Sequence, residues 1–294
     1  MTPECPARPE VRLILNADDF GGSTGVNEAV CALAEAGIVT STSLMVAAKA
    51  APEAVQMARD HPALAVGLHL AVVYGPPLLP PEETPRLRCA DGELDRNCVR
   101  AALRYTFQTA CRRELLREVE AQFQAFDRLQ LGWSHVDSHV HFSLTPVVFR
   151  AMLMQCARYP VIGLRIPEDD YIHAVHEDPG SALPQLPLAL WFGPLCAWQR
   201  RVLRHYPYVT TRRCFGLYRT GRLAAGHLAR LVRALAPGDY ELHCHPDFST
   251  PAGRAEYEAL RSPEFRDALA ARPVRLVTYA DLRGGSRVWD TRKE

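Results

Sequence analysis

The stretch ILNADDFG, residues 14–21, ends an apolar run in a group of polar side chains. Residues 11–15 have the composition of a buried strand, and Asn16, Asp18 and Asp19 follow them directly. Two adjacent carboxylates repel each other, and each is costly to remove from water unless a partner compensates its charge. One interpretation is an Asp-rich turn after the strand. The other is a metal site at the end of the strand.

Short β-type runs alternate with longer helical patterns along the chain. The predicted strands cover residues 11–16, 43–46, 66–70, 134–137, 163–166, 240–243 and 274–278, with a weaker run near 209–214. The predicted helices cover residues 25–36, 51–59, 112–129, 146–158, 188–205, 222–235 and 254–271. This alternation implies a mostly parallel sheet, and the number of repeats favours a β/α barrel over an open sheet.

No linker divides residues 1–294, so we expect one α/β domain with an ordered core of about residues 11–283. The proline-rich segment 74–94 is too polar and broken for a core element, and it predicts a long, lid-like loop. The N-terminus lacks a secretory signal, and no run of ~18 apolar residues predicts a membrane-spanning helix. These features predict a cytoplasmic protein.

The composition, with 48% hydrophobic and 23% charged residues, is typical of a well-packed globular protein. Its net charge of +1 argues against a nucleic-acid partner. Nine cysteines include no CxxC pair, which is not typical of a disulfide framework or a structural zinc site. We therefore expect mostly free thiols in a reducing compartment.

Aspartate and histidine residues gather at the ends of three predicted strands. Asp18 and Asp19 end the first, His69 ends the third, and the sequence HVDSHVH, residues 135–141, ends the fourth. The carboxyl ends of parallel strands converge on one face of a barrel, so these distant segments can meet there. One carboxylate with two imidazoles makes a three-ligand metal site that leaves positions open for water and substrate.

Each part of this pattern also has a simpler interpretation. His69 alone is typical of a buried, hydrogen-bonded histidine, and Asp137 alone is typical of a turn. The HVDSHVH run fits these interpretations less well, because an extended conformation would place four polar residues on one face: His135, Asp137, His139 and His141. A later run, YELHCHPD (240–247), places His243 and His245 on one face and indicates a general acid or a supporting group.

The pieces LILNADDFG, VGLHL, SHVDSHVHFSLTP, LRIP and ELHCHP, in this order, resemble the YdjC-like carbohydrate deacetylases. The resemblance covers residues 11–247, and the stretches LRYTF (103–107) and FGLYRTGRL (215–223) are most similar to the hopanoid-biosynthesis branch. It implies an irregular (β/α) TIM-like barrel. It also implies removal of the N-acetyl group from an N-acetylglucosamine-type sugar, carried on a hopanoid lipid in that branch.

Carried over position by position, the resemblance assigns Asp19, His69 and His139 as ligands of one divalent metal ion. The ligand set suits zinc, and magnesium or manganese stay open. The resemblance assigns Asp18 as the general base that takes a proton from the attacking water. His245, in the late His-Pro motif, is expected to protonate the leaving amine.

The expected substrate-binding residues are Arg165, which matches the family's Arg-x-Pro arginine, together with His141 and Asp137. Two positions depart from the family pattern. Family members often continue the histidine run where residues 143–145 stand here, and Asp247 replaces a small residue after the His-Pro pair.

The segment 183–208 is apolar on more than one face, is interrupted by two prolines and ends in arginines. Its simplest interpretation is a barrel helix packed on the sheet. Together with the 74–94 loop it also suits an apolar collar around a sugar pocket, with the lipid outside. The expected partners are an N-acetylated amino sugar or glycolipid, with contact to the inner membrane face and a homodimer left open.

Three rival functions differ in substrate or in class. The nearest is deacetylation of a soluble chitooligosaccharide or another N-acetylated glycoconjugate. A metal-dependent phosphoesterase is expected to need more carboxylates and a second metal. A non-catalytic, metal-dependent sugar-binding protein has no need for Asp18.

Overall fold

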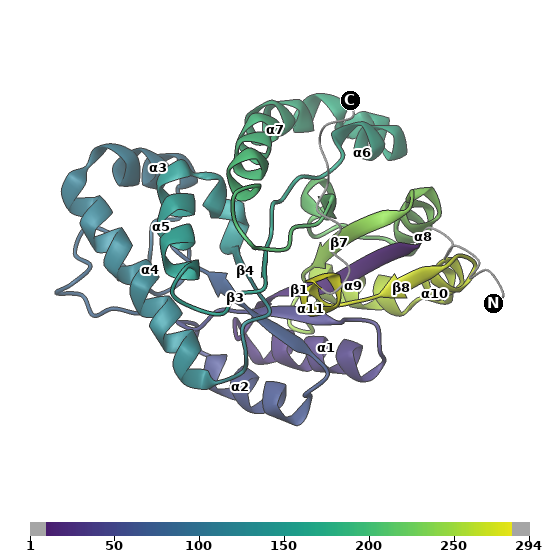
Figure 1. Cartoon of the computed structure of the whole chain (residues 1–294), viewed down its shortest axis with the longest axis horizontal. Helices are drawn as coiled ribbons and strands as arrows, with labels where there is room; N and C mark the ends of the chain where they lie inside the picture. Colours follow the sequence, from purple (N-terminus) through teal and green to yellow (C-terminus); the bar gives the residue numbers. More distant parts are fainter. Residues whose placement is uncertain (1–9, 284–294) are drawn as a thin grey trace, which may run out of the picture.

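The computed structural model describes residues 10–283, with a curled sheet at its centre and helices around it (Figure 1). The path across the sheet is β5-β4-β3-β2-β1-β7-β6, β8 also pairs with β1, and every pair in this sheet is parallel. The strands are β1 (Val11–Phe20), β2 (Ser41–Leu44), β3 (Ala65–Leu70), β4 (His135–Ser138), β5 (Gly163–Leu164), β6 (Arg213–Phe215), β7 (Gly238–Cys244) and β8 (Val274–Leu276). The α/β class and all predicted strands are confirmed.

The two edges of the curled sheet meet and close it into a barrel. An isolated parallel bridge joins Gly163 at one edge to Val209, which precedes β6 at the other edge. The Val209 N–H donates to the Ile162 carbonyl, and the Leu164 N–H donates to the Val209 carbonyl, both at 2.9 Å. The barrel is irregular at β8, which pairs only with residues 11–13 of β1, because β2 pairs with the carboxyl-terminal half of the same edge.

Helices surround the sheet: α1 (Thr24–Glu35), α2 (Ala51–Asp60), α3 (Cys98–Phe107), α4 (Thr109–Leu129), α5 (Pro146–Cys156), α6 (Tyr171–Glu177), α7 (Ala182–Leu203), α8 (Ala225–Ala234), α9 (Pro251–Arg261), α10 (Pro263–Ala270) and α11 (Tyr279–Arg283). The predicted helix 254–271 is two helices, because Ser262 before Pro263 has an extended ψ of 144°. The other predicted helices are confirmed. Helices α3, α6 and α11 have no counterpart among the predicted elements.

The alternation of β1 separates two environments. Leu13, Leu15 and Ala17 face outward into the main apolar core that the helices cover. Ile14 faces inward and packs with Tyr279 and other residues inside the barrel. Because side chains alternate along a strand, Asn16 and Asp18 continue the inward series.

The 74–94 loop packs against α4 through buried carboxylates. Glu118 accepts hydrogen bonds from the Leu78 and Leu79 N–H groups at 2.8 and 3.0 Å. Glu114 accepts one from the Arg86 N–H at 2.7 Å. The ring centroid of Tyr74, the first residue of the loop, lies 6.0 Å from that of His139. The lid-like role of this loop stays a prediction.

Within residues 10–283, the eight cysteines are all unpaired, as expected for most of the thiols. No helix in this part of the chain is long and apolar enough to cross a membrane. The expectation of an N-terminus without a secretory signal concerns residues outside the described range.

Candidate metal centre and active site

Asp18 and Asp19 leave β1 in different directions. Asp18 points into the barrel and is 1% exposed. Asp19 has a φ of +64°, in the left-handed region that non-glycine residues rarely adopt and that Asp tolerates better than most. Its side chain therefore leaves the strand alternation and stays 25% exposed. The two carboxylates face different surroundings, which reduces their mutual repulsion.

His69 and His139 approach Asp19 from β3 and from the segment after β4. His69 is 1% exposed. His139 begins a 3-10 helix, η1 (His139–Leu144), in which Val140 and His141 have left-handed φ angles of +46° and +56°. The extended conformation ends at Ser138, so the polar residues of the HVDSHVH run do not share one face.

The bend separates the histidines of that run. His135 lies inside the barrel, stacked on Tyr279 with ring centroids 4.8 Å apart, and burial lowers the pKa of His135 to about 4. His141 lies instead against His243, with ring centroids 4.8 Å apart. Of the four polar residues in the run, His139 reaches Asp19 and Asp137 reaches His69.

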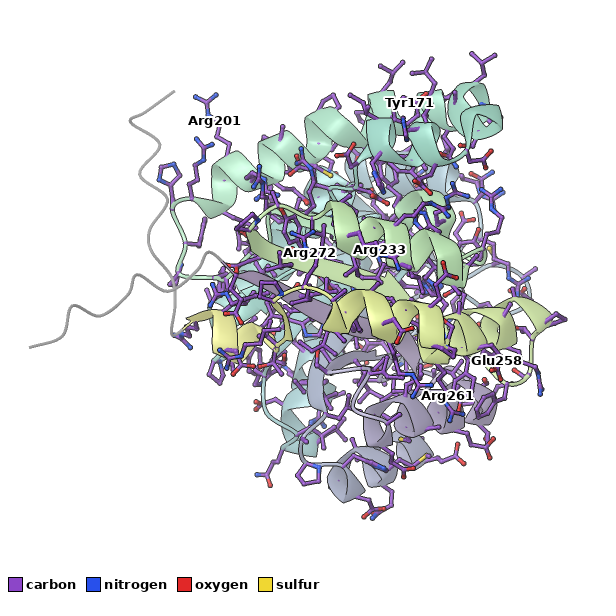
Figure 2. All side chains as sticks on the ribbon, turned by 90° about the vertical axis from the view of Figure 1, so that its right-hand side faces the viewer. Tyr171, Arg201, Arg233, Glu258, Arg261 and Arg272 are labelled. Carbon is purple, nitrogen blue, oxygen red and sulfur yellow. The ribbon has the colours of Figure 1, made fainter. Side chains whose placement is uncertain are left out.

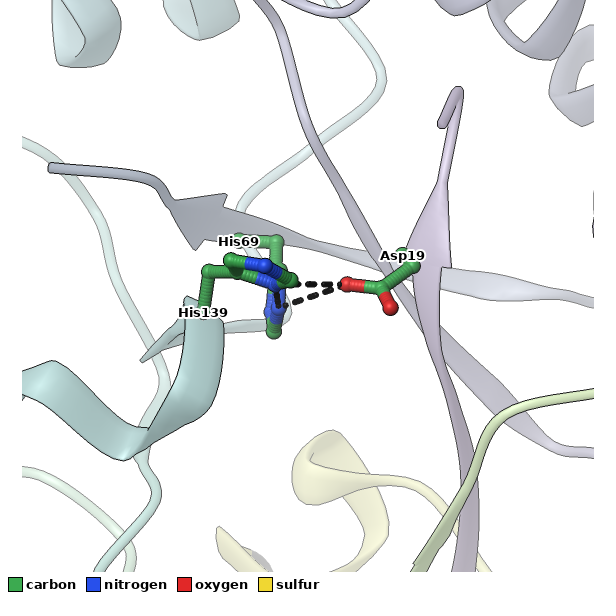
Figure 3. Close-up of side chains that lie close together, drawn as sticks. All are labelled: Asp19, His69 and His139. Carbon is green, nitrogen blue, oxygen red and sulfur yellow. Dashed lines mark hydrogen bonds and ion pairs between the residues drawn. The ribbon is translucent and has the colours of Figure 1, made fainter. Parts of the chain in front are cut away.

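Asp19, His69 and His139 bring three donor atoms together (Figure 3). Asp19 Oδ1 lies 3.2 Å from His69 Nε2 and 2.9 Å from His139 Nδ1. The two ring nitrogens lie 3.3 Å apart. Nitrogen and oxygen ligands of a tetrahedral zinc ion, each at ~2.0–2.1 Å, stand about 3.3 Å apart. The three donor atoms therefore have the spacing of a metal ligand set.

The donor chemistry fits a cation as well. Asp137 Oδ1 lies 2.8 Å from His69 Nδ1, and an ionised carboxylate only accepts, so His69 donates through Nδ1 and turns Nε2 toward Asp19. Burial lowers the pKa of His69, but the charge and hydrogen bond of Asp137 and the hydrogen bond of Asp19 raise it to about 10. Without a metal, a proton on Nε2 thus stands where a cation would bind.

Arg165 pairs with three buried carboxylates next to the three donor residues. It is 2% exposed and donates to both oxygens of Asp18, at 2.6 and 2.8 Å. It also lies 2.6 Å from Asp137 Oδ2 and donates to Glu241 at 2.9 Å. Burial alone would raise the pKa of Asp18, but the charge and hydrogen bonds of Arg165 hold that pKa well below its usual range.

Arg165 and Asp137, both predicted to bind substrate, are thus buried and paired with protein groups. Asp137 is 1% exposed and accepts hydrogen bonds from His69 and Ser43. Both residues lie behind Asp18 and His69.

His245 faces Asp18 from the end of β7. Its Nε2 lies 3.9 Å from Asp18 Oδ2, and its backbone N–H donates to Glu256 at 2.7 Å. Its Nδ1 is buried and has no hydrogen-bond partner in the described residues. The His243 ring contacts both the His245 ring and the His141 ring. Burial together with the Arg165 charge lowers the pKa of His141 to about 3.

A cavity of about 160 Å³ opens beside these residues. Its polar lining comprises Asp18, Asp19, His245, Asp247, Thr220 and Thr250, and the rest is small or apolar. The lining therefore contains the expected base Asp18, the expected acid His245 and one expected ligand, Asp19. The other predicted site residues lie outside this lining: His69, His139, His141, Arg165 and Asp137.

Sequence reasoning missed Glu241, Tyr279 and Glu256. Glu241 stands two residues before His243 in the same strand, so the alternation that placed His243 could also have placed Glu241 inside the barrel. Tyr279 donates to Glu241 at 2.6 Å from the start of α11. No pattern in the sequence indicates that contact or the one between Glu256 and His245.

A family model described as YdjC-like protein matches residues 12–271. The chain belongs to the YdjC-like protein family. Among its relatives, the chitooligosaccharide deacetylase of Enterobacter sp. strain 638 is 28% identical over 282 residues, which cover 92% of this chain and 98% of that protein.

Two carbohydrate deacetylases match this YdjC-like chain more strongly over a shorter region. The Geobacillus stearothermophilus protein is 37% identical over 146 residues, 50% of this chain and 56% of that protein. The Brevibacillus brevis protein is 34% identical over 151 residues, 51% of this chain and 58% of that protein. The chain therefore spans somewhat more than half the length of these two relatives.

A solved structure has the same fold as this YdjC-like chain. It is a proposed cellobiose-phosphate cleavage protein from Enterococcus faecalis V583, with a TM-score of 0.71, 21% identity, and coverage of 93% of this chain and 99% of that protein. The likeness confirms the α/β barrel architecture.

Proposed function

We propose that this protein removes the N-acetyl group from an N-acetylglucosamine-type amino sugar in a metal-dependent hydrolysis. The observation that carries the proposal is the three-donor set of Asp19, His69 and His139 beside a buried, ionised Asp18 at the wall of a cavity. Relatives named carbohydrate and chitooligosaccharide deacetylases support the same chemistry. The reaction consumes water and releases acetate and a free amine.

Asp19, His69 and His139 would hold the metal, and zinc, magnesium and manganese are all compatible with a carboxylate and two imidazoles. A divalent cation at this position supplies Lewis-acid chemistry, which polarises a carbonyl and lowers the pKa of water. Asp137 fixes the ring of His69 through the 2.8 Å contact with Nδ1, so that Nε2 faces the site.

Asp18 is the proposed general base. Its carboxylate lines the cavity next to Asp19 and is ionised because of Arg165. It takes the proton of the water that attacks the acetamide carbon. Arg165 and Asp137 act in this proposal as positioning residues for Asp18 and His69, and not as substrate contacts.

His245 is the proposed general acid. It stands across from Asp18, with Nε2 3.9 Å from Asp18 Oδ2, and it lines the same cavity. In its protonated form it delivers a proton to the sugar nitrogen as the bond from carbon to nitrogen breaks. The predicted substrate-binding role of His141 stays a prediction, and its ring centroid lies 4.8 Å from that of His243.

The decisive experiment measures acetate release from a panel of N-acetylated sugars and glycolipids, before and after chelation and with added zinc, magnesium or manganese. We expect turnover that a chelator removes and that one of these metals restores. No acetate from any substrate, together with metal-dependent sugar binding, would favour the non-catalytic alternative.

A lipid-linked sugar is the finer proposal, and it rests on exposed apolar residues of α6 and α7. Ile172 and Leu183 are 80% exposed, Trp191 is 71% exposed and Leu190 is 67% exposed. With Leu186 they form what we call the apolar patch. Isolated apolar residues on a surface are ordinary, whereas these five come from two helices that contact each other, which is the arrangement of a binding surface.

The amino-terminal end of α7, which carries Leu183 and Leu186, contacts the segment that leads to the cavity. Helix α6 follows the carboxyl end of β5, and Gln185 of α7 donates to the Tyr218 carbonyl at 2.9 Å, two residues before the cavity residue Thr220. Figure 2 shows Tyr171 of α6 and Arg201 of α7 toward opposite ends of the layer that these two helices form. In the carboxyl-terminal half of α7, Trp198 packs on Phe149 instead, so the collar is limited to the first half.

The apolar patch supports a glycolipid whose sugar enters the cavity while its hydrocarbon part, hopanoid or other, contacts α6 and α7. We extend this proposal to peripheral contact with a membrane through the same surface. The relatives that match over most of this chain favour a soluble chitooligosaccharide. The ratio of kcat/KM for an N-acetylglucosaminyl lipid to that for di-N-acetylchitobiose decides between them.

A further inference from the structure

The cavity contains three carboxylates, and they differ in how their charge is compensated. Asp18 is paired with Arg165, and Asp19 contacts His69 and His139. Asp247 forms no ion pair with any described residue. None of the residues that line the cavity is a lysine or an arginine. Asp247 is therefore a carboxylate at the wall of the proposed substrate site that no cationic side chain of the described residues pairs with.

The fold makes room for Asp247 with two glycines from different helices. A Cβ at Gly25, in the first turn of α1, would lie 2.6 Å from Asp247 Oδ1. A Cβ at Gly253, in the first turn of α9, would lie 2.5 Å from Asp247 Cβ. Any larger residue at either position would displace the aspartate, so its place is set by close packing from both sides.

Hydrogen bonds hold one oxygen of this carboxylate and leave the other free. Asp247 Oδ1 accepts from the Ser249 N–H at 2.8 Å and from the Ser249 hydroxyl at 2.5 Å. The Phe248 N–H donates to the Gly25 carbonyl at 3.1 Å, which ties this segment to α1. Asp247 Oδ2 has no hydrogen-bond donor among the described residues and is available to a ligand.

The position of Asp247 also affects the electrostatic potential at the cavity wall. Val26 and Gly253, which line the cavity, belong to the first turns of α1 and α9. Ser23 and Thr250 cap these turns by accepting from the Val26 and Gly253 N–H groups, and Asp247 adds a carboxylate beside ends that favour negative charge. A negatively charged ligand group at this wall would meet the charge of Asp247.

We propose that Asp247 is a specificity-determining residue, which makes the cavity accept an uncharged or amine-bearing sugar and reject a phosphorylated one. Its free Oδ2 accepts a hydrogen bond from a sugar hydroxyl or ammonium group, and its charge repels a phosphate at the same wall. The proposal rests on the proposed function in that it assigns the substrate class of the same site.

The test compares di-N-acetylchitobiose with its two 6-phosphate esters, one on each ring. We expect the wild-type protein to prefer the neutral sugar in kcat/KM by about tenfold or more over the ester whose phosphate lies near Asp247. Asp247→Asn keeps the size and the Ser249 contacts but removes the charge, so that preference falls about tenfold. The preference also weakens at high salt, because salt screens exposed charges.

Glu258→Gln is the matched control. It removes one negative charge, as Asp247→Asn does. Glu258 is an exposed residue of α9 (Figure 2), and it lies outside the cavity lining. Its effect should stay within about twofold. Asp247→Ala is the second charge-removing variant and should shift the preference in the same direction. Equal phosphate discrimination in the wild type, both Asp247 variants and the control would overturn the proposal.

A binding arm separates this inference from the proposed activity. Equilibrium binding is measured by calorimetry with the deacetylated disaccharide and its 6-phosphate esters, which have no acetyl group left to remove. A charge-dependent preference in this arm without turnover on any sugar would leave the Asp247 inference standing and contradict the deacetylase proposal. Turnover with no change on removing the Asp247 charge would do the reverse.

Discussion

The barrel interior and the apolar patch reverse the usual distribution of side chains in opposite ways. Inside the barrel, Arg165, Asp18 and Asp137 place charges where no more than 2% of each residue is exposed. On α6 and α7, large apolar side chains such as Ile172 and Trp191 are 71–80% exposed. Soluble proteins ordinarily bury apolar groups and expose charged ones.

The difference lies in where each group finds its partner. Each buried charge is compensated by another side chain of this protein, so a change to one member leaves the others unpaired. The apolar patch contributes little to the protein's own packing, so a change there affects only what docks on it. Charge-network variants should therefore alter catalysis or stability, and patch variants should alter substrate preference alone.

Loss of a metal ligand should have the largest effect. His139→Ala, His69→Ala and Asp19→Ala each remove one of three donors, and activity should fall by more than the roughly hundredfold that outer contacts of a metal site cost. Elemental analysis should find little bound metal in each variant. His176→Ala, at an exposed histidine of α6, is the control and should keep its metal. Full metal occupancy in the His139 variant would refute the ligand assignment.

Replacement of the base should come next. Asp18→Asn keeps the shape and a hydrogen-bond acceptor for Arg165 but removes the proton acceptor, so turnover should fall by ~10²–10⁴ while metal stays bound. Steady-state kinetics with elemental analysis measure both. Normal turnover would return Asp18 to the Asp-rich turn interpretation. Lost metal would place Asp18 among the ligands.

The contacts behind Arg165 should have a smaller effect. Tyr279→Phe removes the hydroxyl that donates to Glu241 at 2.6 Å, which leaves a buried carboxylate oxygen without that partner. The free energy of unfolding should fall by about 1–3 kcal/mol, and turnover by about tenfold at unchanged KM, because Arg165 holds Asp18 less firmly. Denaturant unfolding and kinetics test this. A variant as stable and active as wild type would show that Glu241 does not support the base.

The apolar patch should give the smallest effect on the protein itself. Trp191→Ser should change the free energy of unfolding by no more than ~0.5 kcal/mol and leave turnover of di-N-acetylchitobiose unchanged, because Trp191 is mostly exposed. Turnover of an N-acetylglucosaminyl lipid should fall several-fold. Trp198→Ser is the contrasting variant: Trp198 packs on Phe149, so it should lose stability and turnover on both substrates. Equal behaviour of the Trp191 variant on both substrates would favour the oligosaccharide.

Local sequence patterns were sufficient for most of the architecture. Apolar runs of the length of strands, separated by helical periods, predicted the strands and most helices because each depends on neighbours in the chain. Pro263 ended a predicted helix early, a local signal that the sequence contained. Helix α3 was missed because it carries exposed apolar residues, such as Phe107, where a polar face is expected.

The sequence by itself determined that Asp18, Asp19, His69 and the HVDSHVH run would gather, because each follows a strand whose carboxyl end lies on the same face of a parallel barrel. It did not determine which side chains would point where. The left-handed φ angles of Asp19, Val140 and His141 decide that, and they break the alternation on which a sequence argument depends.

Only the tertiary structure decided that Arg165 would stand behind Asp18 and that Asp247 would lie between the first turns of α1 and α9. These contacts join segments far apart in the chain. They depend on how the barrel closes and on two glycines that leave room, and neither leaves a period or a motif in the sequence. The residue types of the site could be predicted from the sequence, whereas the side chains that each of them contacts were decided by tertiary packing.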